Sequence, residues 1–241
     1  MPGALLDVQD VTKRFGGFHA LSRVSLGVRE GERFGLIGPN GSGKTTLINC
    51  ISGALRNDGG KIRFGGRDIT GFPAHQRTRL GIVRSFQIPK PFNSMTVLEN
   101  LCIPLEYAAH ARFHGINVTA EAREILGQIG LESKADVTPL GLTQIEMRKL
   151  ELARAMAAKP RLLISDEAMA GLSSAEVDDV LAILFRLNER GITVIMIEHI
   201  MRAVMRFSER IAVLDAGEKI AEGTPDEIVR NKEVERAYLG E

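Results

Sequence analysis

The chain has 241 residues, enough for one large domain or for a domain with a subdomain. Its formal net charge of +1 gives no electrostatic reason to expect binding to nucleic acid or to an anionic membrane. The two cysteines, Cys50 and Cys102, lack C-x-x-C spacing, which argues against a disulfide scaffold or a structural zinc site. The first residues do not read as a signal peptide, and the strongest apolar run, 192–197, is too short to cross a bilayer. If the protein serves a membrane, we expect it to do so as a peripheral subunit.

Short strands are expected in the first third of the chain. Residues 5–8 alternate weakly and read as an edge strand, and residues 11–18 read as a strand that runs into a Gly-rich turn. Phe15 and Phe18 could stack there on a purine ring, or could simply pack on the sheet. Further strands are expected at 24–28, at 33–37 and at 61–64, where Gly65 and Gly66 add a hairpin signal.

A glycine-rich loop after the strand at 33–37 matches the phosphate-binding pattern G-x-x-x-x-G-K-[ST] without a mismatch. Its members are Gly38, Pro39, Asn40, Gly41, Ser42, Gly43, Lys44, Thr45 and Thr46. The backbone N–H groups of such a loop form an anion-binding nest, and the helix behind it adds the positive end of its dipole. Lys44 would reach the β- and γ-phosphates of a nucleotide, and the Thr45 hydroxyl would ligate Mg²⁺.

The middle of the chain is expected to be helical. A strand at 81–87 ends on Gln87, and Pro89 and Pro91 forbid regular structure just after it. Helices are expected at about 96–109, which starts with a capping box, at 120–129 and at 143–158. We therefore expect one domain in which residues 1–87 and 161–241 form the α/β core and residues 88–160 an inserted helical subdomain.

Acidic and imidazole side chains follow two apolar strands of the resumed core. Asp166 and Glu167 end the strand at 161–167, where the aspartate can hold Mg²⁺ and the glutamate can polarise the attacking water. The Gln87 amide can reach metal and water. His199 follows the strand at 192–197, at a place where the carboxyl ends of parallel strands face a ligand, and can donate to the γ-phosphate.

The rest of the core continues the alternation of helices and strands. A helix starts with the capping box at 173–176 and ends at Gly191, and closing strands and short terminal helices follow it. His110 and His114 have the i, i+4 spacing of metal ligands, but without a third ligand a solvated helix face is the better interpretation.

Over nearly its whole length the chain resembles the ATP-binding subunits of ABC transporters. The resemblance rests on the phosphate loop, Gln87 after a strand, residues 162–167, residues 197–199, and the segment 150–155, which is similar to the helix after the family's signature. It implies an ABC-type P-loop nucleotide hydrolase with a RecA-like core, an antiparallel β subdomain and the inserted helical subdomain. It also implies that ATP and Mg²⁺ are bound, and that ATP hydrolysis powers solute translocation.

Within the family the chain is most similar to importers of branched-chain amino acids, on residues 14–17, 81–87, 95–101, 197–199 and 237–241. The resemblance implies that two cassettes dimerise head to tail on the cytoplasmic face of the membrane, with each ATP between one phosphate loop and the partner's signature. Transmembrane permease subunits would dock near residues 88–100, which start at Ile88 and end at Asn100. A solute-binding protein would complete the transporter.

The largest departure from the family lies in its signature, L-S-G-G-Q. The aligned residues here are Leu142, Thr143, Gln144, Ile145 and Glu146. Both glycines are missing, the Ile145 side chain would crowd the approach to a γ-phosphate, and Glu146 puts a carboxylate where negative charge gathers. We therefore expect an obligate heterodimer, in which a different partner supplies the better signature.

Three alternatives remain open at this point. The importer could carry urea, amides or aromatic acids instead of branched-chain amino acids. The chain could be a soluble ABC ATPase without a transport role, although such proteins commonly have two cassettes or long insertions. It could also be a regulatory module that binds nucleotide without hydrolysis, against which the presence of Glu167 and His199 argues.

Overall fold

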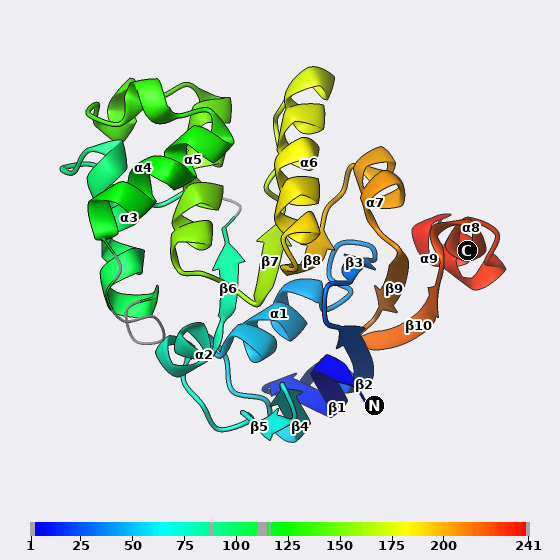
Figure 1. Ribbon diagram of the computed structural model, residues 1–241. Coiled ribbons are helices and arrows are strands. Elements are labelled where there is room, and N and C mark those ends of the chain that lie inside the picture. The colour runs from blue at the N-terminus through cyan, green and yellow to red at the C-terminus, as the bar shows by residue number, and fades with distance from the viewer. Residues whose placement is uncertain (1–2, 87–88, 110–114, 116, 240–241) are drawn as a thin grey trace.

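Two β-sheets with helix α1 between them form the centre of the fold (Figure 1). The computed structural model describes residues 3–86, 89–109, 115 and 117–239. In these residues the larger sheet has six strands, in the order β10-β9-β3-β8-β7-β6, and the smaller has four, in the order β2-β1-β4-β5. The larger sheet consists of β3 (Arg33–Ile37), β6 (Ile82–Ser85), β7 (Leu162–Asp166), β8 (Thr193–Ile197), β9 (Arg210–Asp215) and β10 (Glu218–Gly223). The smaller consists of β1 (Ala4–Phe15), β2 (Phe18–Arg29), β4 (Gly59–Phe64) and β5 (Arg67–Asp68).

The helices cover both faces of the larger sheet. They are α1 (Lys44–Ser52), α2 (Ala74–Leu80), α3 (Val97–Pro104), α4 (Val118–Ile129), α5 (Gln144–Ala157), α6 (Ser174–Glu189), α7 (Met201–Phe207), α8 (Pro225–Val229) and α9 (Lys232–Leu239). A π-helical turn, Leu105–Ala109, extends α3. The expected α/β fold and the expected helices at 96–109, 120–129 and 143–158 are confirmed, and α3, α4 and α5 lie together at one side of the molecule (Figure 1).

The smaller sheet corrects one prediction from the sequence. Residues 5–8 do not form an edge strand; they belong to β1, which pairs with β2 on one side and with β4 on the other. Their alternation is weak because both sets of side chains are buried along this stretch. The strand expected at 5–8 and residues 11–15 of the strand expected at 11–18 are one strand, β1, with a register shift around Asp10, whose φ is 47°. Residues 16–17 form the expected Gly-rich turn, and Phe18 starts β2.

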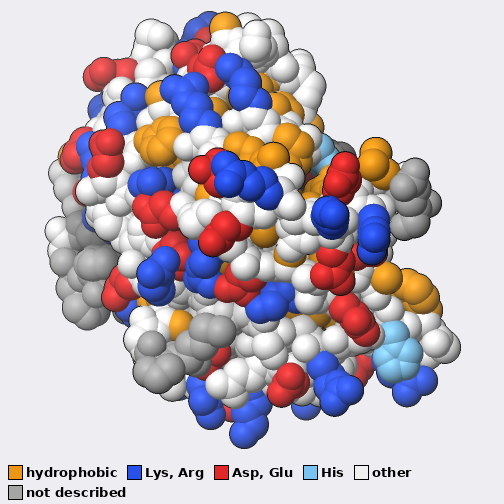
Figure 2. Space-filling model, turned by 90° about the vertical axis from the view of Figure 1, so that its right-hand side faces the viewer, with side chains coloured by type: hydrophobic (Ala, Val, Ile, Leu, Met, Phe, Trp, Pro, Cys, Tyr) orange, Lys and Arg blue, Asp and Glu red, His pale blue; other side chains and the backbone are white. Residues whose placement is uncertain are grey.

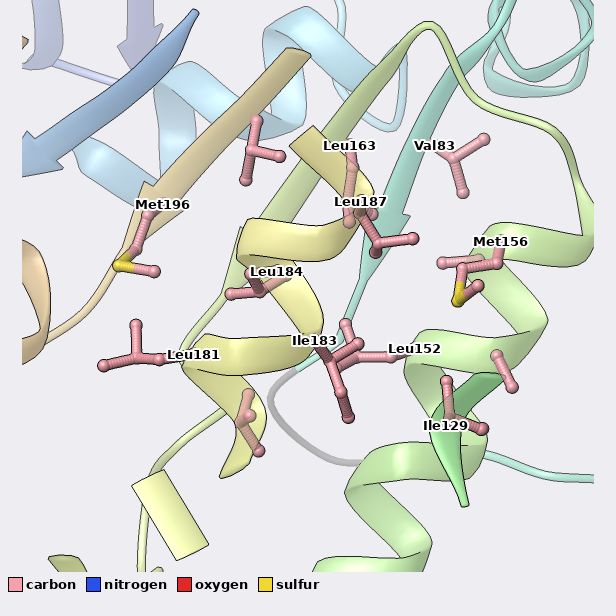
Figure 3. Packing of buried hydrophobic residues seen from close by; sticks show 14 of the residues in the cluster. Val83, Ile129, Leu152, Met156, Leu163, Leu181, Ile183, Leu184, Leu187 and Met196 are labelled. Atoms are coloured by element: carbon pink, nitrogen blue, oxygen red, sulfur yellow. The ribbon is translucent and has the colours of Figure 1, made fainter. Parts of the chain in front are cut away.

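Two apolar cores lie on the two faces of the larger sheet. One joins the α1 side of the sheet to β1, β2 and β4, and the other joins the opposite face to α3, α4, α5, α6 and α7. Figure 3 shows the second core, where Leu187 of α6 lies beside Leu163 of β7 and Ile183 lies beside Leu152 of α5. This packing connects the helices at 97–157 to the strands that end at the site.

Charged side chains are mixed on the surface. On the face that Figure 2 shows, Lys and Arg side chains alternate with Asp and Glu side chains over most of the area. Positive and negative side chains therefore balance on this face, as they do over the whole chain.

Arg77 fastens the C-terminal end of α1. Its side chain is only 1% exposed, and its guanidinium donates to the backbone oxygens of Cys50 at 2.6 Å, Ile51 at 2.9 Å, Thr70 at 3.0 Å and Phe72 at 2.8 Å. The Cys50 and Ile51 carbonyl groups lie in the last turn of α1, where no N–H group of the helix donates to them. The helix behind the phosphate loop is thus held from its far end.

Arg77→Met is expected to lower the free energy of unfolding by about 3 kcal/mol, because buried carbonyl groups lose their donors. Urea denaturation measures the change. Arg79→Met, the same substitution at an exposed position of the same helix, is the control and should stay within about 0.5 kcal/mol of the parent. Equal stability of the two variants would contradict the anchoring role of Arg77.

Candidate active site

The phosphate loop runs from β3 to α1 through backbone that favours glycine. Gly38 has a φ of 151° and Gly43 a φ of 102°. A Cβ on Gly38 would lie 2.1 Å from the carbonyl oxygen of Leu214, and one on Gly43 would lie 2.7 Å from that of Ala20. The loop is therefore pressed against β9 and β2, where no side chain larger than a hydrogen atom fits.

Lys44 folds back onto the loop that it ends. Its Nζ donates to the backbone oxygens of Gly38 at 2.7 Å and Pro39 at 3.0 Å. Burial lowers the pKa of Lys44 below its usual value, and the negative charges of Glu167 and Asp166 offset only part of this effect. The ammonium group thus lies beside two acids and over the loop, where it can meet a phosphate.

A cavity of about 290 Å³ opens over the phosphate loop. It is lined by Phe15, Phe18, Ala20, Asn40, Gly41, Ser42, Gly43, Lys44, Thr45, Thr46, Glu167 and His199. The side chains of Phe15 and Phe18 are more than half exposed, and Lys13 Nζ lies 5.6 Å from the Phe15 ring centroid. The structure therefore brings residues from four separate parts of the sequence into one cavity, with two open aromatic rings at its rim.

Glu167 and His199 meet at the carboxyl ends of neighbouring strands. The Nε2 atom of His199 lies 3.1 Å from Oε1 of Glu167. Glu167 has a φ of 49°, and its backbone N–H donates to the carbonyl oxygen of Ile197 at 2.8 Å. The parallel register of β7 and β8, in which Asp166 is opposite Ile197, produces this meeting. A carboxylate and an imidazole on one side of the phosphate loop can bind and polarise a water molecule.

Asp166 has a partner that the sequence analysis missed. Arg84 of β6 donates to Oδ2 of Asp166 through Nε at 3.1 Å and through Nη2 at 2.5 Å. Its third nitrogen, Nη1, donates to Oδ1 of Asn49 in α1 at 2.6 Å. A charged residue in the middle of the apolar strand expected at 81–87 was the signal for this contact.

Glu198 is a second residue that the sequence analysis passed over. Its side chain is 3% exposed and accepts a hydrogen bond from the backbone N–H of Met169 at 2.9 Å. Burial raises the pKa of Glu198 to about 7, and the negative charge of Glu167 adds to the rise. Arg148 of α5 donates to the carbonyl oxygen of Ala170 at 3.1 Å, so the 169–170 backbone is held from two sides.

The signature-like residues lie at the start of α5, outside the cavity. Thr143 is the N-cap, and Oε2 of Glu146 accepts from its backbone N–H at 2.9 Å and from its hydroxyl at 3.1 Å. These hydrogen bonds and nearby Lys134 hold the pKa of Glu146 below its usual value. The Ile145 side chain packs against the apolar core. The carboxylate expected to face a phosphate is thus turned onto its own helix start.

An apolar groove of about 370 Å³ lies between the core and the helices at 97–157. Aromatic side chains line it, namely Phe86, Phe92 and Tyr107. Next to it, the fully buried Asn100 accepts from the Phe92 N–H at 2.8 Å and donates to the oxygens of Phe92, Met95 and Thr96. Residues 92–96 of the segment expected to dock a membrane subunit are therefore fixed to the start of α3.

Known proteins decide the family. The model of the family described as "ABC transporter" matches residues 21–170, and that of "Branched-chain amino acid ATP-binding cassette transporter" matches residues 218–241. The chain belongs to the ABC transporter family. It is an ATP-binding cassette, an ATPase of the P-loop fold whose activity is coupled to transport. Such cassettes dimerise and work with membrane permease subunits.

Similar proteins cover the whole cassette. A probable branched-chain amino acid transport ATP-binding protein of Archaeoglobus fulgidus is 40% identical over 98% of this chain and 95% of its own length. The high-affinity branched-chain amino acid transport ATP-binding protein of Escherichia coli is 38% identical over all of both chains. The ADP conformation of an ABC transporter cassette superposes with a TM-score of 0.88, at 33% identity over 99% of both chains.

Some expected features of the cassette fall outside the described residues. These are Gln87, at the end of the strand expected at 81–87, and the pair His110 and His114. Within the described part of the chain, no helix combines the length and the apolar character needed to cross a bilayer.

Glu198→Gln is expected to stabilise the cassette at pH 8 and to flatten its pH dependence. The folded-state pKa of about 7 lies above the ordinary value of 4.5, so folding binds a proton between these values, and stability falls as the pH rises through that window. The amide keeps an acceptor for Met169 and removes this loss, on the order of 3 kcal/mol. Urea unfolding at pH 5 and pH 8 measures the difference. Parallel curves for both proteins would contradict the raised pKa.

Proposed function

We propose that this cassette powers an importer of branched-chain amino acids by hydrolysing ATP with Mg²⁺ at the cytoplasmic face of the membrane. The observation that carries the catalytic part is the 3.1 Å approach of His199 to Glu167 in the cavity of the phosphate loop. The relatives are named as transport proteins for branched-chain amino acids. These names favour branched-chain amino acids as the solute over urea, amides or aromatic acids.

In the proposed mechanism, the loop N–H groups and Lys44 bind the β- and γ-phosphates, while Phe15 offers its exposed ring to the base. Glu167 accepts a hydrogen bond from the attacking water and polarises it. His199, fixed by its contact with Glu167, donates to the γ-phosphate. Gln87 would complete the group from the neighbouring strand.

The residues fit a magnesium ion. Thr45 presents a hydroxyl at the start of α1, and the hydrogen bonds that Asp166 accepts from the described residues all go to one oxygen, Oδ2. The Oδ1 atom and the Thr45 hydroxyl, with Gln87, are hard oxygen ligands of the kind that Mg²⁺ prefers. The ion would neutralise charge on the phosphates.

We further infer that the working dimer pairs this cassette with a different one. In the family arrangement, the start of α5 would face the partner's ATP. Here Glu146 already occupies that helix start with a carboxylate, so the positive end of the helix dipole is satisfied from within. A second anion would meet negative charge and, without the two glycines, a backbone that it cannot approach closely.

The remaining partners follow the same proposal. The groove beside residues 88–100 would receive a permease subunit, and a solute-binding protein would deliver the amino acid from the other side of the membrane. The division into a core (1–87 and 161–241) and a helical subdomain (88–160) would let the two parts move with nucleotide. The assignment of the solute is tested by co-purifying the membrane subunits with the cassette and then measuring which solute the purified complex binds.

Glu167→Gln is expected to lower ATP hydrolysis at least about 100-fold while ATP stays bound, because the amide no longer polarises the water. Retention of radiolabelled ATP on the cassette and release of phosphate measure the two effects. Glu189→Gln makes the same change at the exposed end of α6 and should leave both unchanged. A regulatory module without hydrolysis would respond to neither substitution.

The purified chain alone is expected to hydrolyse ATP slowly and without cooperativity. The triple variant Gln144→Gly, Ile145→Gly, Glu146→Gln restores the family's pattern and should raise the rate about tenfold and make it sigmoidal in ATP, because the helix start becomes free to bind phosphate. Steady-state kinetics against protein concentration measure this. Vigorous cooperative hydrolysis by the unchanged chain would contradict the heterodimer.

A further inference from the structure

Arg84 connects three elements around the site. Both Nε and Nη2 of its guanidinium donate to the same carboxylate oxygen, Oδ2 of Asp166 on β7, and Nη1 donates to Asn49 on α1. The side chain of Arg84 is 11% exposed and that of Asp166 is 10% exposed. The pair is thus largely shielded from water, where charge-assisted hydrogen bonds are strong.

The guanidinium of Arg84 also reaches the groove. The ring of Phe86 lies 5.2 Å from Cζ of Arg84, and both side chains line the groove between the core and α5. Half of Phe86 is exposed there. The same guanidinium therefore contacts Asp166 at the site and the Phe86 ring in the groove.

We propose that Arg84 is a positioning residue that shares the charge of Asp166 with Mg²⁺, and that Phe86 makes this sharing sensitive to what occupies the groove. The inference rests on the proposed role of Asp166 in holding Mg²⁺. It goes beyond that role because it assigns the metal affinity of the cassette to a residue outside the phosphate loop and outside the cavity.

The geometry gives the direction of the effect. Arg84 holds Oδ2, which fixes the plane of the carboxylate and leaves Oδ1 for the ion. The same guanidinium offsets the negative charge that attracts Mg²⁺, and the two cations repel each other at short range in a site of low dielectric. Arg84 therefore improves the orientation of Asp166 at the expense of metal affinity.

The contact with Phe86 makes this balance adjustable. The carboxylate of Glu151, in α5, accepts a hydrogen bond from the backbone N–H of Phe86, and Arg154 of the same helix donates to the carbonyl oxygen of Lys90 at 3.0 Å. Movement of α5, or of a permease segment bound in the groove, would therefore shift Phe86. The guanidinium then moves relative to Asp166, and Mg²⁺ binding changes with it.

Calorimetry of ADP binding at increasing Mg²⁺ tests the proposal without turnover. The quantity measured is the Mg²⁺ concentration that gives half of the gain in ADP affinity. Arg84→Met is expected to lower it about tenfold, because one competing cation is removed. Arg84→Lys keeps the charge and should stay within about twofold of the parent, and Arg79→Met, on the exposed face of α2, should not change it.

Phe86→Ala gives a second measurement that does not depend on the folding of Arg84→Met. Removal of the ring loosens the guanidinium and should lower the same Mg²⁺ concentration about threefold. An unchanged or higher Mg²⁺ requirement in Arg84→Met, or in Phe86→Ala if the former does not fold, overturns the inference. Absence of any Mg²⁺ effect on ADP binding by the parent would instead overturn the proposed role of Asp166 and this inference with it.

Discussion

Three parallel strands end at the same edge of the larger sheet, and the site depends on that shared register. β3 leads into the phosphate loop, β7 ends at Asp166, and β8 ends at Ile197, opposite Asp166. The backbone hydrogen bonds of the ladder fix these ends relative to one another before any ligand binds. Glu167 is the first residue after β7 and His199 is the second after β8, so their 3.1 Å contact follows from the sheet.

Much of this arrangement could be predicted because it is local in sequence. The glycine pattern of the loop, the apolar run before Asp166 and the capping boxes at Thr96 and Ser173 each lie within a few residues, and the structure has the expected strand, loop and helices there. The error at residues 5–8 has the opposite origin. Whether a strand is central or at an edge depends on partners far along the chain, and a strand buried on both faces hides its alternation.

The residues that the sequence did not reveal act through contacts between distant elements. Arg84 and Asp166 are 82 positions apart, and Glu198 and Met169 are 29 apart. A charged residue inside an apolar strand signals that Arg84 has a partner, but no pattern of neighbours shows which residue that partner is. Glu146 is a different case, because the T-x-x-E spacing at 143–146 is itself a capping box and could have been read as one. Hydrogen bonds between Thr143 and Glu146 occupy the helix start at which the family signature has its glycines.

The burial of Asn100 has a mechanical consequence. A single amide joins both ends of the turn at 92–96 to the first turn of α3, so this stretch of backbone cannot bend without losing several hydrogen bonds at once. A displacement of this turn would therefore move α3 with it. The buried Asn100 side chain thus couples a displacement of the turn at 92–96 to the position of α3.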